Sequence, residues 1–162
     1  MKRIAVVIGI LALILAAAWA QVSTPKPNPE QKQLEIWLGT WTYEGEAQQT
    51  PLGPAGKYTG KATVSPLFNG LFVEWRGEEK GTAGEFQWSE IDGYDAVNKK
   101  FVWYSFGSEG EFNTAHYTIE ANAVNYAGTT RQGDKEYKFR GTCVFAPNRM
   151  TWTEKREVTL DG

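Results

Sequence analysis

Aromatic and small residues alternate with polar residues along many short segments of this chain. Trp41 and Tyr43 alternate with threonine and glutamate, and Tyr137 and Phe139 alternate with lysine and arginine. A period of two predicts strands with one face in a core and the other in solvent. The predicted strands cover residues 40–47, 57–65, 73–76, 85–92, 100–107, 112–120, 123–130, 137–145 and 150–153.

Turn-forming residues separate these segments at intervals of about ten residues. They include Pro51-Leu52-Gly53-Pro54, Asn69-Gly70 and Gly133-Asp134. Many short strands joined by tight turns indicate an all-β protein, either an antiparallel sandwich or an up-and-down barrel. Beyond one short segment before the first strand, we find no helical period.

The composition fits a single soluble-type domain with a large core. The chain has 162 residues, and 14% of them are aromatic. A net charge of −2 disfavours a nucleic-acid partner, since nucleic-acid binders usually carry a basic patch. The single cysteine, Cys143, excludes an intramolecular disulfide and any multi-cysteine metal site.

The first twenty residues have the pattern of a secretory signal peptide. Lys2 and Arg3 precede an uncharged run from Ile4 to Ala20, which ends in Ala18-Trp19-Ala20. This pattern predicts a signal peptide over 1–20 and a periplasmic or extracellular mature protein, with no membrane contact after cleavage. The alternative is an uncleaved anchor. No cysteine lies near the cleavage point, which excludes a lipoprotein anchor.

A proline-rich stretch follows, and residues 21–33 predict an extended linker before a barrel domain over 34–162. The segment from Pro29 to Gly39 overlaps the end of this linker and predicts a short helix. Leu34, Trp37 and Leu38 fall on one face of it. A helix of about two turns requires packing against another element to be stable.

Four sequence blocks resemble a bacterial family known only as domain of unknown function 1579. They are Trp37-Leu38-Gly39-Thr40-Trp41, Pro51 to Lys57, Gly93-Tyr94-Asp95, and Tyr137 to Thr142. The opening Gly39-x-Trp41, after a short helix, is also similar to lipocalins and their calycin relatives.

This resemblance implies a lipocalin-like, calycin up-and-down β-barrel with a short N-terminal helix capping one end. It implies no reaction. Relatives usually continue beyond Asp161-Gly162 into a further strand. The resemblance therefore implies either a fragment or a barrel that lacks its closing strand.

The inward aromatic residues of such a barrel predict a ligand cavity. At its opening, Glu154 and Arg156 share one face of the last strand with Met150 and Trp152, and they are close enough to pair. The predicted cavity residues are Trp41, Tyr43, Trp75, Trp103, Tyr117, Tyr137, Phe139, Trp152, Glu154 and Arg156.

Our leading hypothesis is a binding protein for a small, largely apolar molecule, with no catalytic residue, cofactor or metal. One alternative is a carbohydrate-binding or other interaction module that uses an exposed aromatic strip including Trp88. Another is a haem-binding barrel with His116 as iron ligand, or an isomerase-type barrel enzyme. Glu44 and Glu46 are expected on a solvated face, and Cys143 in the core. The oligomeric state is left open.

Overall fold

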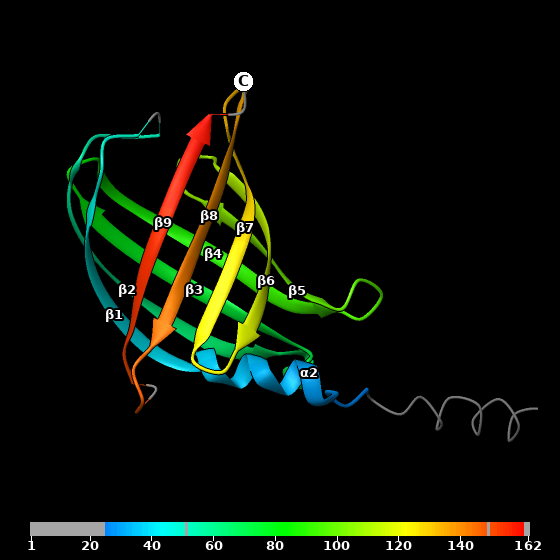
Figure 1. The fold of residues 1–162 in the computed structure, drawn as a ribbon. Coiled ribbons are helices and arrows are strands. Elements are labelled where there is room, and N and C mark those ends of the chain that lie inside the picture. Colours follow the sequence, from blue (N-terminus) through cyan, green and yellow to red (C-terminus); the bar gives the residue numbers. More distant parts are fainter. Residues whose placement is uncertain (1–24, 51, 149, 161–162) are drawn as a thin grey trace, which may run out of the picture.

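The computed structural model describes residues 25–50, 52–148 and 150–160. They form one antiparallel sheet in which each strand pairs with the next along the chain. The sheet curls into a half-barrel, as Figure 1 shows. Its strands are β1 (Gly39–Ala47), β2 (Gly56–Leu67), β3 (Phe72–Gly81), β4 (Gly84–Asp95), β5 (Lys100–Gly107), β6 (Phe112–Glu120), β7 (Ala123–Gln132), β8 (Lys135–Phe145) and β9 (Trp152–Leu160).

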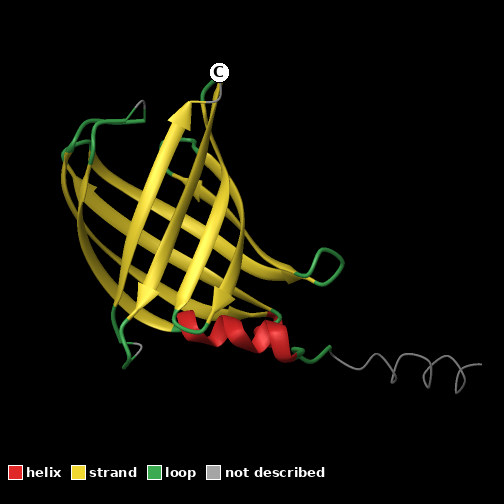
Figure 2. Cartoon of the chain, viewed as in Figure 1, coloured by secondary structure: helices red, strands yellow, loops and turns green. Residues whose placement is uncertain are grey.

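The strand order β1 to β9 contains no crossover, so the topology is up-and-down. Figure 2 shows the strands wrapping around a common interior, with loops at both ends. Within the part of the chain that the structure describes, the sheet order gives no pairing between β1 and β9. The prediction of an all-β, up-and-down fold is confirmed. The fold is compatible with a calycin-like barrel whose first and last strands, among the described residues, are not hydrogen-bonded to each other.

A short helical segment lies across one end of the half-barrel (Figure 1). It consists of α2 (Pro29–Lys32) followed by the 3₁₀ helix η1 (Gln33–Trp37). Asn28 caps the start, because its side chain accepts a hydrogen bond from the backbone N–H of Gln31 at 2.8 Å. The predicted helix therefore exists, but its second half is wound more tightly than an α-helix.

The helical segment closes this end of the barrel with two side chains. Leu34 is 1% exposed and Trp37 is 6% exposed. The Trp37 ring packs on Trp75 and Phe145, with centroids 5.4 Å and 5.1 Å apart. Aromatic pairs at this spacing add to the burial of their apolar area. We call Leu34, Trp37, Val73, Trp75 and Phe145 the closed end.

Four aromatic rings on the inner face lie directly opposite glycines of the neighbouring strand. Tyr43 pairs with Gly60, Tyr58 with Gly45, Trp88 with Gly77, and Tyr126 with Gly141. A methyl group on any of these glycines would overlap the facing ring. Each ring therefore lies flat against the sheet, because glycine leaves the space free.

One detail of the strand prediction is wrong. Met150 was placed on the inner face of the last strand, but β9 begins at Trp152. Met150 is 75% exposed in the preceding turn, where Asn148 accepts a hydrogen bond from its backbone N–H. The predicted signal peptide lies outside the described residues. Among those residues, no helix is both long enough and apolar enough to cross a bilayer.

Candidate functional site

The barrel interior divides into two zones that differ in their contact with solvent. Beside the helical segment, the side chains of the closed end are buried. Further along the strands, Tyr43, Trp88 and Trp103 are half-buried although they face inward. Glu154 and Arg156 are exposed on the inner face of β9. Water therefore reaches the interior on the side away from the helix.

The solvent-reached zone combines aromatic and charged side chains from both walls of the barrel. We call this set the lumen site. Its members are Tyr43, Tyr58, Glu79, Trp88, Glu90, Trp103, Tyr126, Phe139, Glu154 and Arg156. Two of them, Tyr126 and Phe139, are buried beside the others.

Hydrogen bonds and ring contacts hold these side chains in place. The indole Nε1 of Trp88 donates to the Tyr43 hydroxyl at 3.1 Å. The Tyr126 hydroxyl donates to a carboxylate oxygen of Glu154. The guanidinium of Arg156 lies over the ring of Phe139, 4.3 Å from its centroid. A cation over an aromatic face is an attractive arrangement, so the Phe139 ring helps to position Arg156.

Burial raises the pKa of three interior carboxyl groups, those of Glu79, Glu90 and Asp92. Burial raises the pKa of Glu79, and the charge of Arg156 partly counters that rise. Burial raises the pKa of Glu90 well above its ordinary value, and the charge of Asp92 raises it further. The residue as a whole is half-buried on the inner face of β4. The lumen site contains three carboxyl groups, those of Glu79, Glu90 and Glu154, and one guanidinium group, that of Arg156.

Asp92 lies deeper, between the lumen site and the closed end. It is 2% exposed, and burial raises its pKa to about 7. The indole Nε1 of Trp75 donates to its carboxylate at 2.6 Å. The nearby hydroxyl of Tyr117 and the indole N–H of Trp37 are buried without a hydrogen-bond partner of ordinary geometry within the described ranges. Such unpaired groups are costly in a core and are uncommon.

A hollow of about 70 Å³, which we call the entrance hollow, lies between the β1–β2 connection and the β3–β4 turn. Tyr58, Glu79 and Phe86 line it from the inside, and Lys57 and Thr82 line its rim. Because Tyr58 and Glu79 belong to the lumen site, this hollow borders that site. Its volume is that of a small chemical group.

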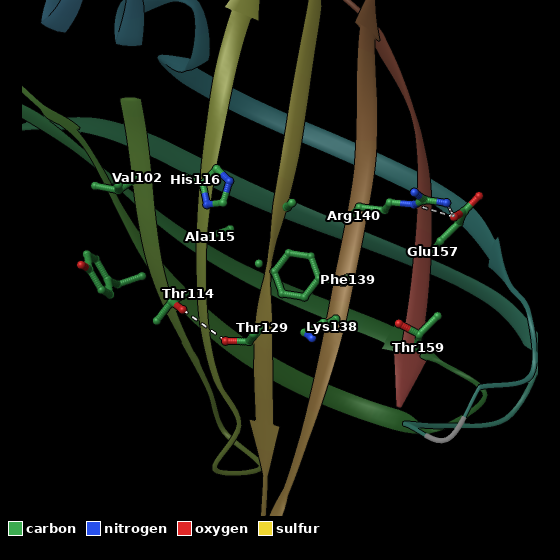
Figure 3. A pocket seen from close by; sticks show the side chains of 13 residues that line it. Val102, Thr114, Ala115, His116, Thr129, Lys138, Phe139, Arg140, Glu157 and Thr159 are labelled. Atoms are coloured by element: carbon green, nitrogen blue, oxygen red, sulfur yellow. Dashed lines mark hydrogen bonds and ion pairs between the residues drawn. The ribbon is translucent and has the colours of Figure 1, made fainter. Parts of the chain in front are cut away.

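A larger hollow, of about 760 Å³, lies on the outer face of β5 to β9. Figure 3 shows His116, Lys138 and Arg140 around it, with Arg140 paired to Glu157. The Arg140–Glu157 ion pair spans 2.8 Å, and the Thr114 and Thr129 hydroxyls lie 3.4 Å apart. This outer hollow is a broad concave surface. Most of its side chains occupy outward-facing positions of the strands, between residues whose side chains face the barrel interior. Its ion pair is solvent-exposed, which weakens it as an anchor for a ligand.

The structure brings together only half of the ten predicted cavity residues. Tyr43, Trp103, Phe139, Glu154 and Arg156 belong to the lumen site. The other predicted residues lie elsewhere inside the barrel and are mostly buried: Trp41, Trp75, Tyr117, Tyr137 and Trp152.

Trp41 and Trp152 both contact Trp37 of the closed end. The Trp41 indole donates to the backbone carbonyl of Trp37 at 2.7 Å. The ring of Trp152 lies 6.4 Å from that of Trp37. The structure does not test whether any of these residues binds a ligand, and that role stays a prediction.

Sequence reasoning missed several interior groups, although the period of two contained the signal. Since Trp75 faces inward, Gly77 and Glu79 on the same strand must face inward too. By the same rule, Glu90 and Asp92 on β4 must face inward, because Trp88 does. None of these carboxyl groups was among the predicted cavity residues, because acidic residues are rarely inside.

Two alternatives for single residues are wrong. Trp88 is not part of an exposed strip, because its ring faces inward, 6.2 Å from that of Trp75. His116 is exposed on the outer face, where it lines the outer hollow. It therefore cannot ligate a haem iron inside the barrel. The expected positions of the other two groups are confirmed: Cys143 is buried, and Glu44 and Glu46 are exposed.

Within residues 25–50, 52–148 and 150–160, no three histidine, cysteine or acidic side chains are arranged to hold a metal ion. No curated protein matches the chain. A family described as "Protein of unknown function (DUF1579)" matches residues 26–161, which include every strand of the half-barrel and its helical segment. The chain therefore belongs to the DUF1579 family.

Proposed function

We propose that this protein binds a small molecule in the lumen site. The observation that carries the proposal is the exposure of inward side chains. Tyr43, Trp88 and Trp103 face the interior but keep contact with water. A barrel that served only as a packed core would bury these rings completely, because their apolar area favours burial.

The chemistry of the walls supports a ligand with an apolar body and one polar group. Aromatic rings supply apolar contact area, and a few placed polar groups fix orientation. Both elements are present, since the rings of Trp103 and Tyr126 lie 5.1 Å apart beside Glu154 and Arg156. A ligand of this kind agrees with the small, largely apolar molecule expected from the sequence.

The experiment is a calorimetric titration of the folded protein with small aromatic molecules, beginning with neutral benzyl alcohol. Binding should be detectable, and it should weaken in a Trp103→Ala variant that removes part of the aromatic wall. A Tyr104→Ala variant is the matched control, because Tyr104 lies on the outer face and is 49% exposed. Equal loss of binding in both variants would contradict the proposal.

We also propose that residues 1–20 direct the chain to the periplasm or the cell exterior. The support is the basic start, the uncharged run and Ala18-Trp19-Ala20. Fractionation of cells that express the full chain, with N-terminal sequencing of the product, tests this. A mature N-terminus at Gln21 outside the cytoplasm is expected, and an intact Met1 in the cytoplasm would contradict it.

A further inference from the structure

The lumen site and its base contain more acidic than basic groups. The carboxyl groups of Glu79, Glu90, Asp92 and Glu154 share the interior with the guanidinium of Arg156. In the described part of the chain, Arg156 makes no ion pair, and its close contact is with the Phe139 ring. A second positive charge between these carboxylates would relieve their repulsion.

The walls around the carboxylates suit an organic cation. The rings of Tyr43, Trp88 and Tyr126 are held against the sheet, so that their faces border the lumen. Aromatic faces attract cations, most strongly where water is partly excluded. Aromatic rings and carboxylates around one space form the lining that binds substituted ammonium groups.

A buried hydroxyl gives an independent sign that the cluster lacks a partner. Tyr117 is 2% exposed, and its hydroxyl has no hydrogen-bond partner among the described residues. This hydroxyl lies close enough to Asp92 and Glu90 for their charges to raise its pKa, in addition to the effect of burial. The polar groups at the base of the lumen site are therefore left incompletely satisfied.

The geometry points to a small organic cation, an ammonium group on an apolar body, as the ligand of the lumen site. The inference rests on the proposed function, because it names the ligand class of that same site. The cationic group lies between Glu79 and Glu154, and the apolar body lies against Tyr43 and Trp88. Glu79 also lines the entrance hollow.

Three probes with the same benzyl or phenyl ring test the inference by calorimetry: benzyltrimethylammonium, benzyl alcohol and benzoate. We expect the cation to bind at least about tenfold more tightly than the alcohol, and benzoate to bind most weakly. Raising the salt concentration should weaken only the binding of the cation.

Matched variants locate the cation. Glu79→Gln and Glu154→Gln should each weaken benzyltrimethylammonium binding about fivefold and leave benzyl alcohol binding unchanged. Glu44→Gln is the control on the outer face, where Glu44 is exposed, and it should change neither affinity. Circular dichroism and the urea midpoint of each variant establish that it is folded.

The outcomes separate this inference from the proposed function. Equal affinity for the cation and the alcohol, or tightest binding of benzoate, would overturn the cation inference and leave the proposed function standing. Failure of all three probes to bind the folded protein would overturn both. If both glutamine variants kept the full preference for the cation, the cationic group would not lie between Glu79 and Glu154. That result would overturn the inference.

Discussion

The indole Nε1 of Trp88 on β4 donates a hydrogen bond to the hydroxyl of Tyr43 on β1, at 3.1 Å. This bond reaches across the two strands between them. The two rings lie over Gly77 and Gly60, which face them on those intervening strands. The pair forms a continuous aromatic surface on one wall of the barrel. Burial raises the pKa of Tyr43 to about 12, so its hydroxyl keeps its proton at physiological pH.

A methyl group beneath one of these rings should displace the ring and destabilise the fold. Gly77→Ala would place Cβ against the indole of Trp88. We expect a loss of about 1–3 kcal/mol in the free energy of unfolding, because overpacking forces the ring off the sheet. Urea denaturation followed by tryptophan fluorescence measures it. The control is Gly53→Ala, since no atom lies within 4 Å of a Cβ at that position. Equal stability of the two variants would contradict the role assigned to Gly77.

The closed end depends on the helical segment for its core. Leu34 is 1% exposed, so Leu34→Ala should cost about 2–5 kcal/mol of unfolding free energy. Glu35→Ala changes the exposed neighbouring residue. It should lower the free energy of unfolding much less than Leu34→Ala does. Thermal and urea unfolding of both variants provide the comparison. A Leu34→Ala variant as stable as the parent would show that the segment does not hold the barrel together.

Stability should fall as the pH rises, because of Asp92. Its pKa in the folded protein is about 7, against an ordinary value of 3.8. Between these values the folded protein holds a proton that the unfolded chain has released. The contribution of Asp92 to the unfolding free energy should therefore fall by a few kcal/mol as the pH rises from about 4 to about 7.

Asp92→Asn tests this assignment, since an amide keeps an acceptor for the Trp75 indole but cannot ionise. The variant should show a shallower pH dependence than the parent protein. Glu90 titrates with Asp92, so part of the slope should remain. The control Glu46→Gln lies on the outer face and should keep the full slope. An unchanged slope in Asp92→Asn would contradict the account.

Cys143 should behave as an inert core residue. It is 7% exposed, and burial raises the pKa of its thiol, with the charge of Glu154 adding to the rise. The reactive thiolate is therefore scarce. A disulfide exchange reagent should label the native protein much more slowly than the urea-unfolded protein. Equal rates would mean that the thiol is open to solvent.

Much of the fold could be predicted from the sequence, because alternation and turns are local signals. The predicted strand at 123–130 became Ala123–Gln132, and that at 85–92 became Gly84–Asp95. The start of β9 was harder to place. Met150 is apolar, but the turn at Asn148 keeps it outside the sheet.

The candidate site could be predicted only in part, because it depends on which side chains meet across the barrel. Glu154 and Arg156 were found from their shared face on one strand. Glu79 and Glu90 come from the opposite wall, and they meet Arg156 only once the sheet has curled. Short-range periodicity gives the direction of a side chain but not its distant neighbours.

The most direct test of the central claim is to map where a ligand binds. In nuclear magnetic resonance titrations with benzyltrimethylammonium, the indole N–H signals of Trp88 and Trp103 and the amides around Glu154 should shift. Signals from the outer hollow, at His116 and Lys138, should stay in place. Shifts confined to His116 and Lys138 would place binding outside the barrel and contradict the account.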